Sequence, residues 1–286
     1  MTATASPLAG APTRAAVMAQ ARSENFPVAS RLVGARRRAH LLAVYGFARL
    51  VDDAGDEAGG DRLALLDAIE DDLDRLYVAG ERPEHAVLRA LAPTVEALGL
   101  PAAPFRRLIE ANRRDQVLER YPTYEALLDY CQLSAAPVGE LVLHIFGAAT
   151  PERIRLSDRI CAALQITEHL QDVAEDRGRG RVYLPAEDLE CFGATDDDLL
   201  ASAPSPAFAA LMAFQVTRAR ALLDDGAGLI RRLGPGGAVA VGGFVAGGRA
   251  ALAAIAAAGY DVLGNRPRPT RAAFAASLAA TLGRRR

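Results

Sequence analysis

The chain has 286 residues, and 51% of them are hydrophobic, which is enough for one large domain with a substantial core. The 33 basic and 35 acidic residues give a net charge of -2 and form no basic stripe, so nucleic acid is excluded as an expected partner. Three cysteines without a C-x-x-C pair and four histidines without an H-x-x-x-H pair argue against a zinc site and a disulfide framework. We therefore expect a cytoplasmic protein.

Residues 1–20 are expected to be a disordered lead, because they lack the charged start and apolar core of a secretory signal. From residue 21 to 286, alternating β-branched runs are almost absent, and Ala, Leu, Arg and Glu recur at helical spacing. This pattern predicts one all-α domain of roughly eight to ten helices. Helix breaks are predicted at residues 56–60, 80–83, 99–104, 121–123, 150–151, 178–185, 202–206 and 234–237.

The apolar helix predicted over residues 41–51 ends in an acidic cluster, within the sequence YGFARLVDDAGDE. Asp52 and Asp56 are four residues apart, so they point the same way and lie about 6 Å apart along the helix axis. They can therefore share a cation. Arg49, one turn earlier, can grip a phosphate or form a salt bridge with these acids. Tyr45 can orient a phosphate, stabilise a carbocation or simply pack.

The same four-residue spacing occurs between Asp67 and Asp71, in the charged segment DRLALLDAIEDDLDRL. We assign that pair to a solvated helix face, because the helix that carries it is rich in charged residues. Further along, Pro137 interrupts the helix predicted over residues 123–149 and should kink it. The small residues beside the kink leave two alternatives open, a closely packed neighbouring helix or a widened ligand cavity.

A second acidic cluster lies in the sequence CAALQITEHLQDVAEDRGRGRVYLP, which begins at Cys161. Asp172 and Asp176 repeat the four-residue spacing, and Glu168 lies one turn before them. Carboxylates on apolar helices are costly to bury unless they are paired or bind a metal. With no histidine or thiolate nearby, they favour a hard cation such as Mg²⁺ that also binds substrate phosphate oxygens. Ordinary salt-bridged surfaces remain the alternative.

Basic residues follow the second cluster in a glycine-rich loop. Arg177, Arg179 and Arg181 come directly after Asp176, and Tyr183 follows them. Each arginine can bind a phosphate or form an ion pair with the neighbouring aspartates. Like Tyr45, Tyr183 can orient a phosphate, stabilise a carbocation or simply pack.

Residues 236–260 are long enough to cross a membrane and carry one charge, Arg249. Their apolar residues are mostly alanine and glycine, which favours two tightly packed buried helices over a membrane span.

Together, the motifs Y-x-F-x-R-x-x-D-D-x-x-D and Q-x-x-x-x-x-Q-D-V-x-E-D-x-x-x-G-R-x-Y-L-P resemble the signatures of the squalene/phytoene synthase family. The resemblance extends from about Arg22 to Arg232 and includes ANRRDQ from Ala111 and YCQLSAAPVGELVLHIFG from Tyr130. It implies a single-domain isoprenoid-synthase helical bundle with a central hydrophobic cavity, Mg²⁺ as cofactor and a prenyl diphosphate as substrate.

The resemblance also implies roles for individual positions. Metal binding is expected at Asp52, Asp56, Asp172, Asp176 and Glu168, although Glu168 stands where condensing synthases have asparagine. Catalytic roles are expected at Tyr45, Arg49 and Tyr183, and substrate contacts at Phe26, Arg49, Gln165 and Arg181.

Within the family, the opening ENFPVAS at residues 24–30 resembles the hydroxysqualene synthase branch. Glu24 and Gln171 stand where condensing synthases have Lys and Arg, so two cations are missing. Fewer cations suit a substrate with one diphosphate. The resemblance thus implies a carbon–oxygen lyase that converts presqualene diphosphate to hydroxysqualene. Water is the expected terminator, because no G-x-G-x-x-G motif follows a strand.

Two other readings remain open. One is a condensing synthase that makes squalene, dehydrosqualene or phytoene from two prenyl diphosphates. The other is a non-catalytic relative that serves as a binding or assembly module. Peripheral contact with the inner membrane and association with neighbouring pathway enzymes also stay open.

Overall fold

The computed structural model describes residues 7–19, 34–264 and 266–283, and within these residues the chain is helical, without a β-strand. The helices are α1 (Arg14–Ala19), α2 (Ala35–Asp56), α3 (Arg62–Asp74), the 3₁₀ helix η3 (Arg75–Tyr77), α4 (Ala86–Leu98), α5 (Ala102–Asp115), α6 (Tyr124–Ser134), α7 (Ala136–Ile145), α8 (Pro151–Gln171), α9 (Val173–Gly178), α10 (Ala186–Phe192), α11 (Asp196–Leu199), α12 (Pro206–Gly226), the 3₁₀ helix η4 (Ala227–Arg232), α13 (Pro235–Ala257) and α14 (Arg271–Gly283). The predicted all-α class and the predicted breaks are confirmed. The count was too low, because short helices such as α9 and α11 were missed.

Local sequence signals set many of these boundaries. The side chains of Asp61, Thr123, Thr150 and Ser205 each accept a hydrogen bond from a backbone N–H in the first turn of the helix that follows. At the other end, α4 stops at Gly99, whose left-handed conformation (φ 59°) suits a residue without a Cβ.

The expectation of a disordered lead over residues 1–20 is wrong for the segment that forms α1. Val17 of α1 is fully buried, and α1 packs on α2. Burial of this apolar side chain offsets the entropy cost of ordering one short helix.

The chain separates into two compact units, each described by itself. Unit 1 comprises the described residues up to Val117 together with residues 137–149, and unit 2 comprises residues 118–136 and the described residues from Thr150 onward. In unit 1, α2 packs against α1, α3, α4 and α5. Phe47 and Phe105 meet edge to face there, with ring centroids 5.0 Å apart, and both are fully buried.

Two expectations from the sequence stay predictions. One is that residues 21–286 form a single domain, and the other is that the fold encloses a central hydrophobic cavity.

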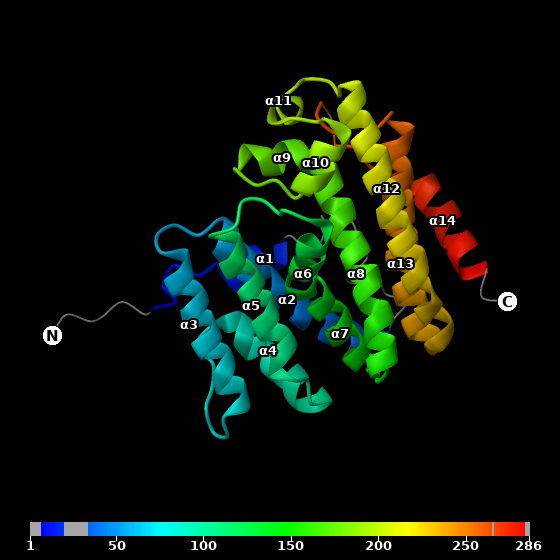
Figure 1. Cartoon of the computed structure of the whole chain (residues 1–286). Coiled ribbons are helices and arrows are strands. Elements are labelled where there is room, and N and C mark those ends of the chain that lie inside the picture. Colours follow the sequence, from blue (N-terminus) through cyan, green and yellow to red (C-terminus); the bar gives the residue numbers. More distant parts are fainter. Residues whose placement is uncertain (1–6, 20–33, 265, 284–286) are drawn as a thin grey trace. The chain divides into compact units, whose positions relative to one another are not determined.

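In unit 2, α8, α12 and α13 lie side by side, and α14 packs along α13 (Figure 1). Glycines let these helices approach closely. A Cβ at Gly248 of α13 would lie 2.6 Å from a methyl carbon of Leu164, and one at Gly242 would lie 2.7 Å from Leu282. Small residues therefore mark contact points between helices.

The prediction of two helices over residues 236–260 is wrong, because α13 is continuous from Pro235 to Ala257. Its glycines serve close packing and do not interrupt the helix. The helix is long and apolar enough to cross a membrane, but 67% of its most apolar window is buried inside the protein. Arg249 forms an ion pair with Asp224 (2.5 Å) and donates a hydrogen bond to Thr281 (2.9 Å). Burial within unit 2 was the preferred reading, and it is confirmed.

The kink predicted at Pro137 is a complete break. Helix α6 ends at Ser134 and α7 starts at Ala136, so Pro137 lies in the first turn of α7, where its missing N–H costs no helical hydrogen bond.

The prediction that Asp67 and Asp71 lie on a solvated helix face is also confirmed, since both are exposed and Asp67 pairs with Arg113 (2.5 Å).

Candidate functional site

The first acidic cluster lies along one face of α2 in unit 1. Tyr45, Arg49, Asp52 and Asp56 occupy positions i, i+4, i+7 and i+11, which an α-helix gathers into a stripe roughly 60° wide. The stripe combines two carboxylates, a guanidinium and a phenol. These are groups that bind a cation or a phosphate.

Asp52 is held by a neutral partner. The side-chain amide of Asn112 on α5 donates to Asp52 Oδ1 (3.2 Å) and to the carbonyl of Leu108 (3.2 Å). The surrounding protein removes much of the water around Asp52 although its side chain keeps exposed surface, and this desolvation raises its pKa to about 7. The Asn112 hydrogen bond and the charge of Arg49 act in the opposite direction. No described arginine or histidine forms an ion pair with Asp52.

Arg49 pairs with the next residue along the chain. Its Nε lies 2.7 Å from Asp53 Oδ1, and its Nη2 lies 3.6 Å from Glu57. Asp53 is buried, with 3% of its side chain exposed, and desolvation raises its pKa while Arg49 lowers it. The salt-bridge alternative for Arg49 is therefore observed, and its roles in catalysis and substrate binding stay predictions.

Close packing of α2 on α5 fixes this arrangement. A Cβ at Gly55 would lie 2.3 Å from Asn112 Oδ1, so only glycine fits there without a shift. Gln116 donates to the carbonyl of Gly55 (3.0 Å) and to that of Asn112 (3.1 Å). The sequence ANRRDQ thus supplies Asn112 and Gln116, which hold the acidic end of α2. Our sequence analysis did not identify either role.

The second acidic cluster lies where α8 gives way to α9 in unit 2. Asp172 separates the two helices, yet its N–H donates to the Glu168 carbonyl (3.0 Å) and its own carbonyl accepts from Asp176 N–H (2.8 Å). The predicted four-residue register is therefore kept through the break. Glu168 is partly exposed on α8, one turn earlier.

A connector between α13 and α14 contacts this cluster. Arg266 Nε lies 2.6 Å from Asp172 Oδ1, and the Gln171 side chain donates to the carbonyl of Pro267. Desolvation raises the pKa of Asp172 to about 6, and the charge of Arg266 opposes that rise. Gln171 is 4% exposed. Its amide binds the connector, and the interpretation that Gln171 marks the loss of a second diphosphate pocket stays a prediction.

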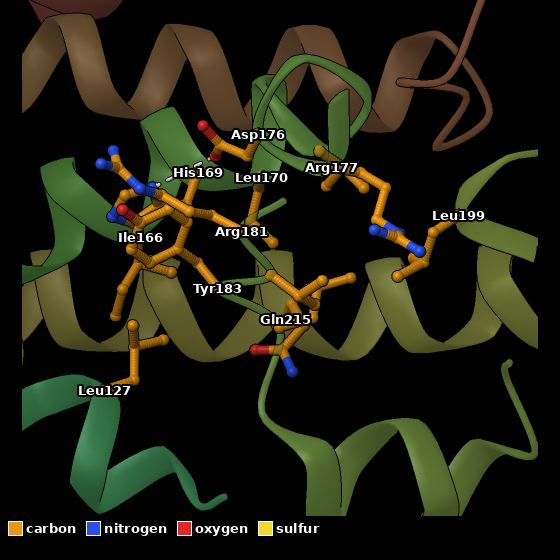
Figure 2. A pocket seen from close by; sticks show the side chains of 13 residues that line it. Leu127, Ile166, His169, Leu170, Asp176, Arg177, Arg181, Tyr183, Leu199 and Gln215 are labelled. Atoms are coloured by element: carbon orange, nitrogen blue, oxygen red, sulfur yellow. Dashed lines mark ion pairs between the residues drawn. The ribbon is translucent and has the colours of Figure 1, made fainter. Parts of the chain in front are cut away.

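His169 lies beside Asp176 of the second cluster (Figure 2). Its Nδ1 is 3.5 Å from Asp176 Oδ2, and its Nε2 is 3.1 Å from the Gln165 amide nitrogen. The ring stacks on Tyr183, with centroids 3.6 Å apart. The expectation that no histidine lies near these carboxylates is wrong. His169 is one helical turn before Asp172 on a continuous helical path.

Tyr183 belongs to a buried aromatic cluster. Its ring centroid lies 5.7 Å from those of Tyr121 and Tyr130, and 7% of the residue is exposed. Arg181 lines the same narrow pocket as Tyr183, His169 and Asp176, and the free volume there is about 10 Å³, roughly one water molecule (Figure 2). Packing is observed for Tyr183, and its catalytic role stays a prediction.

The other arginines of the glycine-rich loop have acidic neighbours. Arg179 pairs with Glu175 (3.0 Å), and Arg177 lies 3.9 Å from Asp196. Two residues named from the sequence, Glu24 and Phe26, lie outside the described residues. The first cluster belongs to unit 1 and the second to unit 2, so each is described separately.

The donor atoms of both clusters fit Mg²⁺. They are carboxylate oxygens, the ligands that hard cations prefer. Asp172 Oδ1 and Asp176 Oδ2 are buried and lie 2.6 Å from Arg266 Nε and 3.5 Å from His169 Nδ1, whereas Asp52 has no ion pair among the described residues. No group of three or more acidic, histidine or cysteine side chains able to hold a metal occurs in the described parts of the chain. A cation there would therefore complete its coordination with water and phosphate oxygens, as Mg²⁺ commonly does.

Comparisons with known proteins agree on one family. A family model described as squalene/phytoene synthase matches residues 19–273. The chain is 39% identical over 210 residues to hydroxysqualene synthase of Rhodopseudomonas palustris, covering 72% of this chain and 70% of that protein. It is 33% identical over 225 residues to 15-cis-phytoene synthase of Synechococcus elongatus, covering 74% and 72%.

Solved structures give the same result for the fold. The crystal structure of squalene synthase HpnC from Alicyclobacillus acidocaldarius matches with a TM-score of 0.79 and 45% identity, covering 90% of this chain and 95% of that one. A dehydrosqualene synthase crystallised with a ligand matches with a TM-score of 0.83 at 22% identity, covering 95% of each chain. The second match supports the fold alone.

Proposed function

Because the chain belongs to the squalene/phytoene synthase family, whose members are prenyltransferase-type enzymes, we propose that it converts presqualene diphosphate to hydroxysqualene. The reaction releases diphosphate, captures water and depends on Mg²⁺. It would take place in the cytoplasm as a step of squalene and hopanoid biosynthesis. Relatives named hydroxysqualene synthase, at 39% and 35% identity, support this choice within the family.

The observation that carries the proposal is the environment of Asp52. Its side chain keeps exposed surface, faces the same side of α2 as Asp56 and accepts a hydrogen bond from the Asn112 amide, with no ion pair to a described residue. A carboxylate that no neighbouring cation neutralises favours a cation from outside. Bound Mg²⁺ with a diphosphate would supply that charge.

The residues of each cluster would have separate roles in binding Mg²⁺ and the diphosphate. Asp52 and Asp56 on α2 would hold Mg²⁺ in unit 1, and Asp172 and Asp176 at the junction of α8 and α9 would hold Mg²⁺ in unit 2. Asn112 would keep Asp52 oriented, and the chemistry that bound Mg²⁺ supplies there is neutralisation of the departing diphosphate.

Loss of diphosphate from presqualene diphosphate leaves a cyclopropylcarbinyl cation, which opens and combines with water; the attacking water loses a proton to the solvent, which gives the alcohol. Tyr45, on the acidic face of α2, would offer its aromatic ring to a nearby cation. Tyr183 is buried and its ring stacks on His169, so it would act by holding that residue in place. Arg181 would bind an oxygen of the departing diphosphate.

Condensation of two prenyl diphosphates is the second candidate. It is favoured by the 33% identity to 15-cis-phytoene synthase of Synechococcus elongatus. The choice between the two reactions therefore depends on the substrate that the enzyme accepts.

A direct test offers the enzyme farnesyl diphosphate or presqualene diphosphate, each with Mg²⁺ or with a chelator, and identifies the products by mass spectrometry. The proposal predicts Mg²⁺-dependent hydroxysqualene from presqualene diphosphate and no C30 product from farnesyl diphosphate alone. A C30 hydrocarbon from farnesyl diphosphate would favour the condensing reaction.

A further inference from the structure

An open groove of about 680 Å³ lies in unit 1 at the opposite end of α2 from Asp52. The start of α2, the end of α4 and the end of α7 form its walls, through residues 34–40, 97–98 and 144–147. Asp52 follows Arg37 by fifteen residues, which corresponds to about 22 Å along the helix. The groove is therefore separate from the acidic end of α2.

The lining of the groove is cationic. Arg36, Arg37, His40 and His144 contribute to it, and no carboxylate is found among the described residues that line it. Arg36 and Arg37 are exposed, and neither forms an ion pair with a described residue. The pKa of His40 is lowered by burial and then by the charge of Arg36, as expected where no anion neutralises that arginine.

These charges are placed at an unfavourable position within their own helix. The first turn of α2 contains no acidic residue, and among the described residues no side chain caps its N-terminus at Gly34. Arginines at a helix N-terminus oppose the helix dipole, so this end of α2 combines two sources of positive potential. An anion bound in the groove would relieve both.

The other walls are apolar. Ile145, Phe146 and Leu98 line the groove beside the arginines, and the Arg37 guanidinium lies over the Phe146 ring at 5.2 Å from its centroid. Cationic side chains at a rim, with aliphatic and aromatic side chains next to them, complement a phosphate headgroup attached to acyl chains.

We propose that this groove binds the phosphate headgroups of anionic phospholipids and docks the protein on a negatively charged membrane surface. The net charge of the whole chain is -2, so overall electrostatic attraction does not account for such docking, and the local cluster must supply it. This inference goes beyond the proposed reaction and does not depend on it.

Vesicle flotation tests the proposal. The full chain is mixed with vesicles of phosphatidylcholine alone or with a share of phosphatidylglycerol, and the floated protein is measured. The wild type should bind the anionic vesicles and not the neutral ones. The double variant R36Q/R37Q should bind the anionic vesicles about thirtyfold more weakly, since each arginine near such a surface contributes about 1 kcal/mol, or about fivefold.

The matched control is R220Q/R231Q, which removes two exposed arginines from unit 2, and it should bind within twofold of the wild type. Circular dichroism verifies folding, which R36Q/R37Q should preserve because both side chains are exposed. The proposal is overturned if the wild type ignores anionic vesicles or if both double variants lose binding equally. It is also overturned if millimolar inorganic phosphate releases the protein at constant ionic strength, because the groove would then be a site for small anions.

Discussion

Asp52 and Asp53 are adjacent in the sequence but have different partners. Asp53 is buried against Arg49, whereas Asp52 keeps exposed surface and accepts a hydrogen bond from Asn112. The four-residue spacing from Asp56 correctly selected Asp52 as the acid that shares a helix face with it. Spacing alone could not show that Arg49 neutralises Asp53, because one arginine can reach either neighbour.

Replacing Asp52 or Asp176 by Asn keeps the size of the side chain and removes the charge that would bind the cation. We expect turnover of presqualene diphosphate to fall by roughly a hundredfold or more, about 3 kcal/mol in barrier, in steady-state kinetics at saturating Mg²⁺. Asp71→Asn is the control, since that side chain is exposed and should leave turnover unchanged. Near-normal turnover in both site variants would show that these acids are structural.

Stability of the metal-free protein should depend on Asp52 and Asp172 in a defined direction. Desolvation raises their pKa values in the folded state to about 7 and about 6, above the usual aspartate pKa of 3.8. The folded state therefore binds more protons than the unfolded state between these values, so the stability these groups contribute is present below pH 3.8 and is lost as the pH rises towards 7.

Asp52→Asn removes the loss of stability that deprotonation of Asp52 causes as the pH rises. Thermal melts in a chelator from pH 4 to pH 8 should show a variant that gains stability relative to the wild type as the pH rises, reaching roughly 2 °C or more in melting temperature at pH 8. Comparison with the wild type cancels contributions from other titrating groups. A difference that is constant with pH, or that shrinks as the pH rises, would contradict the assigned environment of Asp52.

Several residues at the two clusters could not be found from the sequence. Asn112 is 60 residues from Asp52, and Pro267 is 96 residues from Gln171. Such contacts depend on how helices pack, which local patterns do not encode. His169 was within reach, because helical spacing alone places it one turn before the residues around Asp172.

At the scale of elements, the close contact of α2 with α5 depends on one glycine. Gly55→Ala would place a Cβ 2.3 Å from Asn112 Oδ1 and force the amide away from Asp52. We expect a loss of roughly 1–3 kcal/mol in chemical denaturation, together with weaker Mg²⁺-dependent turnover. Gly59→Ala is the control, since nothing lies within 4 Å of its Cβ position, and it should be near neutral. Equal stabilities for the two variants would refute the close-packing account.

Helix α13 shows how composition can be misread. Its many glycines predicted a break, yet they allow Leu164, Leu223 and Leu282 to approach a continuous helix. The break-forming tendency of glycine is overcome because tertiary packing outweighs a propensity of about 1 kcal/mol per residue.

Arg249 distinguishes a buried helix from a membrane span. Arg249→Leu would favour insertion into a membrane, but in the folded chain it removes the contacts to Asp224 and to buried Thr281. We expect a loss of roughly 1–3 kcal/mol in the free energy of unfolding. Arg159→Leu, which breaks an exposed pair with Asp225, should cost less than about 1 kcal/mol. If denaturation gave Arg249→Leu the stability of the wild type, the role of Arg249 within unit 2 would be wrong.

For the whole molecule, the sequence was sufficient for the class and for the order of helices, because proline, glycine and capping residues mark nearly every boundary. It was not sufficient for the division into two units. That division follows the chain as it leaves unit 1 after Val117 and returns at Pro137. The crossings at Pro137 and at Thr150 had local signals, a predicted kink and a predicted break, but neither signal shows that the chain changes unit there.

The central claim is that water terminates the reaction of presqualene diphosphate, and isotope labelling tests it most directly. The enzyme is incubated with presqualene diphosphate and Mg²⁺ in H₂¹⁸O without a nicotinamide, and the product is analysed by mass spectrometry. We predict hydroxysqualene that carries one ¹⁸O atom, and none when Mg²⁺ is chelated. Unlabelled product, a C30 hydrocarbon, or turnover that needs a reductant would contradict the account.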